Sequence, residues 1–164
     1  MLYVKSVGDE NYADSEASKE ISFKVETPEP EIDYVVLPFS FNDNGTALAK
    51  IVGVTVDGVG DYGTVDAKIA LKAAGNKFTI KYNTAATSLS FNTNQNGSRG
   101  TSVITVSGST DGIGFTTIQT IKCNEGQNKK TLRNISAIDS TYRYIQISLT
   151  TKGDNIGIGK IDLK

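Results

Sequence analysis

The sequence predicts an all-β protein, an antiparallel two-sheet β-sandwich, on two observations. Apolar and polar residues alternate along most apolar stretches, as in residues 103–107 and 144–148, and this period of two places successive side chains on opposite faces of a sheet. The 16 glycines and the frequent Thr, Ser and Asn residues favour strands and tight turns over helices. The chain has no histidine, so the commonest general base and transition-metal ligand is missing.

The first 32 residues differ in composition from the rest of the chain. Strands are predicted over residues 2–7 and 21–25, joined by a polar loop. Residues 27–32 contain Pro28 and Pro30 between acidic residues, which is typical of a stiff, extended linker. Residues 1–32 hold eight acidic and three basic side chains. This imbalance indicates either a solvated acidic segment or a unit of separate origin.

The remaining residues, 33–164, follow a strand rhythm. Residues 34–41 form the first predicted strand, in which Pro38 indicates an edge position or a bulge. Residues 42–63 form a long connection rich in Gly, Asp and Asn, with one helical turn predicted over residues 46–50. Further strands are predicted over residues 67–73, 77–82, 88–93, 102–107, 115–122, 130–135, 143–150 and 156–163. Gly, Asn and Asp turns separate them, which favours antiparallel pairing in a jelly roll.

The alternation makes a prediction about individual side chains. The odd-numbered residues of 103–107 should lie on one face of their strand and the even-numbered residues on the other. Tyr144, Ile147 and Leu149 should not all share a face, because their spacing breaks parity. No long helix is expected in residues 33–164.

Three segments resemble galactose-binding-like jelly rolls, the superfamily of the discoidin domains and many carbohydrate-binding modules. From Ser102 the sequence SVITVSGSTDGIGFTTIQTI resembles one of their hairpins, and residues 142–147 and 156–163 resemble their last two strands. Residues 33–41 resemble the opening strand of such modules in secreted, multidomain proteins of Bacteroides-type bacteria. The resemblance implies a secreted or cell-surface accessory module without catalytic activity, which binds carbohydrate or another extracellular ligand. The alternative is a structural spacer or protein–protein interaction domain.

Residues 1–26 resemble the last two strands of a fibronectin type III domain, without the five strands that precede them in that fold. The alternative is an N-terminal hairpin that belongs to the main domain. An isolated hairpin is marginally stable in water, so its apolar residues need a partner; they are Leu2, Val4, Val7, Ile21, Phe23 and Val25. We expect two such hairpins to pair across a two-fold axis, as a dimer produced by truncation. Light scattering with and without residues 1–27 tests this, and an equally dimeric shortened chain would contradict it.

Saccharide binding needs exposed aromatic rings together with amide and guanidinium groups. Residues 94–100 are predicted to form a loop in which polar side chains gather, and the turns at residues 124–127 and 152–155 should lie at the same end of the sandwich. The alternative is a merely solvated loop. Trp, an aromatic residue suited to stacking on sugars, is absent. The candidate ligand-binding residues are Asn94, Gln95, Asn96, Arg99, Tyr62 and Tyr82.

Calcium is the one ion that the composition favours, because its ligands are carboxylate, amide and carbonyl oxygens. Asp43, Asp57 and Asp61 lie in the long connection and are the candidate ligands of a structural calcium. Neither surrounding segment has the regular calcium-loop pattern, so ordinary turn residues are the alternative. No other cofactor is expected.

Several function classes are disfavoured. The acidic residues lie mostly in turns beside Gly or Asn, so no catalytic carboxylate pair is predicted, and Ser-His-Asp and Cys-His mechanisms need the histidine that the chain lacks. Cys123 is the single cysteine and is expected to be a small buried residue. The net charge of −1 gives no field that recruits nucleic acid. No apolar run approaches the ~20 residues of a membrane span.

Overall fold

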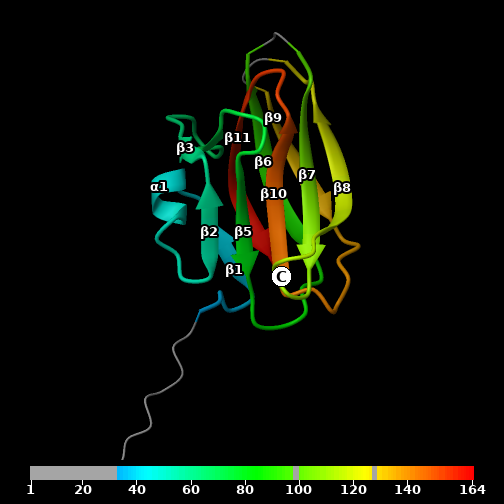
Figure 1. Cartoon of the computed structure of the whole chain (residues 1–164). Helices are drawn as coiled ribbons and strands as arrows, with labels where there is room; N and C mark the ends of the chain where they lie inside the picture. Colours follow the sequence, from blue (N-terminus) through cyan, green and yellow to red (C-terminus); the bar gives the residue numbers. More distant parts are fainter. Residues whose placement is uncertain (1–32, 98–99, 127–128) are drawn as a thin grey trace, which may run out of the picture. The chain divides into compact units, whose positions relative to one another are not determined.

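The computed structural model describes residues 33–97, 100–126 and 129–164. Several predictions concern residues outside the described ones: the fibronectin-like strands of residues 1–26, the linker of residues 27–32, the dimer through the N-terminal hairpin, and the ligand-binding role of Arg99. The described part is almost all-β, with two antiparallel sheets packed face to face (Figure 1). The predicted β-sandwich is confirmed.

One sheet has six strands and the other has five. In the six-stranded sheet the order is β3 (Val59–Asp61), β4 (Ile69–Leu71), β11 (Asn155–Leu163), β6 (Leu89–Asn96) and β9 (Lys130–Ile135), and β1 (Phe39–Phe41) also pairs with β11. In the five-stranded sheet the order is β2 (Val54–Asp57), β5 (Lys77–Lys81), β10 (Tyr144–Thr151), β7 (Ser102–Ser109) and β8 (Thr116–Cys123).

The core lies between the two sheets and follows the predicted alternation. Ile145, Ile147 and Leu149 of β10 are buried, whereas Tyr144 is half-buried on the opposite face of the strand. On β7, Ile104 and Val106 are likewise buried while Val103 and Thr105 are partly exposed. Cys123 is buried as expected, and burial raises the pKa of its thiol. Each sheet therefore contributes one apolar face to the core and turns the other outward.

Residues 42–63 are more ordered than the sequence predicted. The helical turn is present as α1 (Gly45–Leu48), where the Asn44 side chain accepts a hydrogen bond from the Ala47 amide at 2.8 Å. The long connection also contains β2 and β3, which the prediction missed. Between them Gly58 has a φ of +65° and lies against Asn76. This left-handed residue lets the chain leave the five-stranded sheet at Asp57 and enter the six-stranded sheet at Val59.

The first predicted strand, over residues 34–41, is shorter in the structure. It forms regular pairing only in β1, and Val35 makes an isolated bridge with Tyr82. Pro38 precedes β1 and lies in no strand, so it is neither an edge residue nor a bulge, although β1 itself is an edge strand that pairs with β11 alone.

The outer face of β11 is covered by the connection that precedes β4. Gly157 and Gly159 lie on this face, and a Cβ atom added to Gly159 would come within 2.4 Å of the Asp66 carbonyl oxygen. Asp66 also forms an ion pair with Lys160, with 3.1 Å between the carboxylate oxygen and Nζ. The two glycines therefore allow the connection to lie directly on the strand.

Candidate functional site

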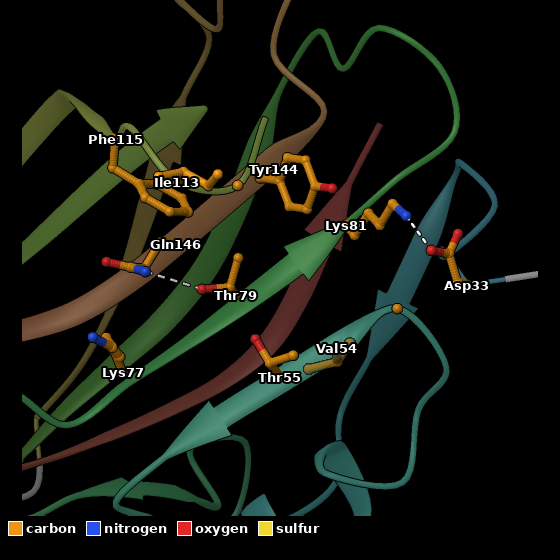
Figure 2. Close-up of a pocket in the computed structure, with 12 residues that line it drawn as sticks. Asp33, Val54, Thr55, Lys77, Thr79, Lys81, Ile113, Phe115, Tyr144 and Gln146 are labelled. Carbon is orange, nitrogen blue, oxygen red and sulfur yellow. Dashed lines mark hydrogen bonds and ion pairs between the residues drawn. The ribbon is translucent and has the colours of Figure 1, made fainter. Parts of the chain in front are cut away.

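The outer face of the five-stranded sheet contains a groove with a volume of about 670 Å³ (Figure 2). Strands β5 and β10 form its floor, and β2 and the residue that precedes it form one side. The connection between β7 and β8, residues 110–115, contributes the other side through Gly112, Ile113 and Phe115. The side chains on the floor alternate with buried residues such as Phe78 and Ile145, so the groove faces away from the core.

A row of neutral polar side chains crosses the floor. Strand register places Thr55 opposite Thr79, and Thr79 opposite Gln146. The Gln146 amide nitrogen donates a hydrogen bond to the Thr79 hydroxyl oxygen at 3.0 Å, as Figure 2 shows. Two hydroxyls and one amide thus lie side by side and offer both donors and acceptors to a bound molecule.

Beside this row, aromatic and apolar side chains line the groove. Tyr144 lies on the floor, and Phe115 and Ile113 lie next to it on the connection (Figure 2). Ile113 is 87% exposed, so its side chain is accessible to a bound molecule. Gly112 has a φ of +76°, and a Cβ added there would lie 2.9 Å from the Tyr144 ring. Because glycine has no Cβ atom, the connection can lie directly against the Tyr144 ring at Gly112.

Asp111 holds the 110–115 connection in shape from within. Its Oδ1 atom accepts hydrogen bonds from the Ile113 amide at 2.8 Å and the Gly114 amide at 3.0 Å. The Ser109 hydroxyl donates to the same oxygen at 2.9 Å. These bonds, led by the one from the Ile113 amide, hold the pKa of the Asp111 carboxyl below its ordinary value of 3.8. Hydrogen bonds within the connection itself therefore set the shape of this wall of the groove.

Replacing Asp111 by alanine should loosen this wall. The Ile113 and Gly114 amides should exchange with solvent faster, because they lose their acceptor. Since the folded-state pKa of Asp111 lies below 3.8, its stabilisation should be complete above pH 3.8 and lost as the pH falls through the lower folded value. Amide hydrogen exchange followed by NMR checks both effects.

Asp139 provides the matched control, since its Oδ1 accepts the Thr141 amide at 2.8 Å in a comparable turn outside the groove. Asp139→Ala should leave the Ile113 amide unchanged. Equal protection of Ile113 in the wild type and the Asp111→Ala variant would contradict this role.

Two lysines complete the floor. Lys81 forms a hydrogen-bonded ion pair with Asp33, which raises the pKa of the lysine (Figure 2). Lys77 lies further along β5, with its Nζ atom 3.8 Å from a carboxylate oxygen of Asp57. Both lysines line the groove, as does Asp33.

The polar residues predicted to form a binding loop lie elsewhere. Asn94 and Gln95 are each 3% exposed and belong to β6, so the expectation of an exposed loop starting at residue 94 is wrong. The strand continues because residues 94–96 pair with β11. The Gln95 amide donates hydrogen bonds to the Gly100 carbonyl and to Asp154. Asn96 is half-buried at the end of β6.

The prediction that the connections after β8 and β10 lie at the same end of the sandwich as the one before β7 is nevertheless confirmed. Register places the end of β8 and the end of β10 beside the start of β7. The groove lies toward the other end of β7, where the 110–115 connection begins.

The two tyrosines predicted to be exposed are largely enclosed. Tyr82 is 1% exposed, and burial raises the pKa of its hydroxyl to about 12. Tyr62 is half-buried with an enclosed hydroxyl, and burial also raises its pKa. Asn96 and Asn155 lie close enough to the Tyr62 hydroxyl to oppose that shift, although neither meets hydrogen-bond geometry. The aromatic rings that line the groove are those of Tyr144 and Phe115, which the prediction did not select.

The three candidate calcium ligands have separate partners. Asp61 accepts hydrogen bonds from the Thr46 hydroxyl at 2.7 Å and the Thr46 amide at 2.8 Å, which lower its pKa. Asp57 lies beside Lys77, and Asp43 accepts the Asn44 amide at 2.8 Å. Across residues 33–97, 100–126 and 129–164, no three acidic or cysteine side chains gather as a metal site would require. These residues do not fit a shared calcium cage, and the ion stays a prediction.

No family model and no curated protein matches this chain, but solved structures do. The K2 cleaved adhesin domain of Lys-gingipain aligns with a TM-score of 0.61 at 12% identity, over 78% of this chain and 98% of that one. The K3 adhesin domain from Porphyromonas gingivalis gives 0.56 at 8%, over 77% and 96%. A family 29 carbohydrate-binding module gives 0.54 at 14%, over 77% and 90%.

Among the described residues no helix is long and apolar enough to cross a membrane.

At sequence identities of 8–14%, the structural matches define the fold alone. The chain therefore has a β-sandwich fold like those of the adhesin domains and the carbohydrate-binding module.

Proposed function

We propose that this chain is a non-catalytic binding module of a secreted or cell-surface multidomain protein, and that it binds a saccharide in the groove of the five-stranded sheet. The observation that carries the proposal is the lining of that groove. A polar row of Thr55, Thr79 and Gln146 lies next to the Tyr144 ring and the apolar wall of the connection.

Saccharides present two kinds of surface, and the groove has a counterpart for each. Their hydroxyl groups need donors and acceptors in fixed positions, which the Thr and Gln side chains offer. Their C–H faces pack on aromatic rings, which Tyr144 offers beside Ile113 and Phe115. The likeness in fold to a carbohydrate-binding module and to adhesin domains supports the same reading.

The small number of carboxylates among the described lining residues favours binding over hydrolysis. Glycoside hydrolases generally use two carboxyl groups that flank the scissile bond. Asp33 is the one carboxylate among the described lining residues, and it is already ion-paired with Lys81. A bound saccharide would therefore be held and released unchanged.

A glycan array followed by isothermal titration calorimetry tests the proposal. We expect at least one saccharide to bind, and Gln146→Ala to weaken it by about 1 kcal/mol, the usual value of a neutral hydrogen bond. Gln119→Ala is the matched control, because Gln119 is an exposed glutamine of edge strand β8 outside the groove. If no saccharide binds, a spacer or protein-interaction domain is the better description.

A further inference from the structure

The charged side chains of the groove carry an inference about which saccharides it accepts. Lys77 and Lys81 lie on the same face of β5, separated by Thr79. Four residues of a strand span about 13 Å at 3.3 Å per residue. Two cations thus lie along β5 on either side of the neutral polar row, at a Cα separation that suits a chain of sugars better than a single ring.

Both lysines have partners that a ligand can replace. The carboxylates of Asp57 and Asp33 are 70% and 67% exposed, whereas the lysine side chains are 43% and 31% exposed. The Lys77 pair is loose, since its Nζ–Oδ2 distance is 3.8 Å. Ion pairs between such exposed groups contribute little free energy. An anionic group that enters the groove can therefore replace these carboxylates as the partner of each lysine at a small cost in free energy.

We infer that the groove selects acidic saccharides, with uronate carboxylates paired to Lys77 and Lys81. This inference rests on the proposed function. The sugar hydroxyls between the carboxylates would meet the row of Thr79 and Gln146, and a ring face would lie on Tyr144. A neutral saccharide has no group that replaces Asp33 or Asp57, so it gains nothing from the two cations.

The experiment compares each acid with its own uncharged form. Oligosaccharides of galacturonate, mannuronate and glucuronate are titrated by calorimetry beside their methyl esters, which keep the backbone and remove the charge. At least one acid should bind about tenfold or more tightly than its ester, as expected for a charge-assisted hydrogen bond. The difference should shrink as salt is raised, because exposed charges are screened.

Single substitutions assign the effect to the two lysines. Lys77→Gln and Lys81→Gln should each weaken the acid about tenfold and leave the ester unchanged. Asp33→Asn should strengthen binding of the acid, because it removes the carboxylate that competes for Lys81. Lys122→Gln should have no effect, since Lys122 is an exposed lysine of β8 outside the groove. A variant with damaged folding would weaken acid and ester alike, which separates that case from a charge effect.

Equal binding of acids and esters would overturn the inference and leave the proposed function intact. Binding of neutral saccharides alone would have the same consequence, provided that Gln146→Ala still weakens that binding. If Asp33→Asn binds the acid with wild-type affinity, Asp33 does not compete with the ligand for Lys81. Absence of binding to every acid, every ester and every saccharide of the array would overturn the proposed function as well.

Discussion

Replacing Tyr144 by alanine should weaken saccharide binding by about 2 kcal/mol, or roughly thirtyfold, the size expected for a central aromatic contact. The ring lies on the floor of the groove beside Gly112, and the polar row has no other aromatic neighbour on the floor among the described lining residues. Its loss removes the stacking face and leaves the 110–115 connection without the ring against which Gly112 packs. Calorimetry with the saccharide that binds best in the array measures the effect.

Tyr144→Phe is the control, because it keeps the ring and removes only the hydroxyl. Its affinity should stay near that of the wild type. Tyr144 is half-buried on the outer face, so thermal unfolding of both variants should show a folded protein. Wild-type affinity in Tyr144→Ala would place the ligand elsewhere.

Replacing Gly159 by alanine should destabilise the fold by about 3 kcal/mol, at the upper end of the usual cost of overpacking. The added Cβ would lie 2.4 Å from the Asp66 carbonyl oxygen and 2.8 Å from the Ala67 Cα atom. Both are backbone atoms, so the overlap cannot be relieved by turning a side chain. The connection would have to lift from β11, and Asp66 would lose its position beside Lys160.

Urea unfolding measures the change in free energy, and Gly63→Ala is the matched control. Gly63 lies in the same connection, and a Cβ added there meets nothing within 4 Å. The control should unfold at nearly the wild-type midpoint. A Gly159→Ala variant as stable as the wild type would show that the connection yields easily.

Strand alternation was sufficient to predict most of the sandwich. The predicted strand over residues 130–135 matches β9 at both ends, and that over residues 143–150 matches β10 within one residue. In β10 a single buried face imposes the period of two on the sequence. Strands β2 and β3 were missed because each is short and Gly58 interrupts them. Their pairing with β5 and β4 is a long-range property that local composition does not report.

The groove was harder to predict than the fold, and the tyrosines show why. Tyr82 shares parity with the buried Phe78 and Ile80 of β5, so alternation alone places its ring in the core. Tyr144 has the opposite parity from Ile145 and Ile147, and the same argument places it outside. Polar composition was the weaker guide, since Asn94 and Gln95 lie in β6 and pair with β11. The approach of the 110–115 connection to β10 depends on tertiary structure.

The central claim is that the groove of the five-stranded sheet is the saccharide site. Chemical-shift mapping on isotope-labelled protein, titrated with the saccharide that binds best in the array, tests it most directly. The perturbed amides should cluster at Thr79, Lys81, Tyr144, Gln146 and Ile113, which line the groove together. Shifts confined to residues 94–97 and 100–101, at the opposite end of β7, would contradict the claim.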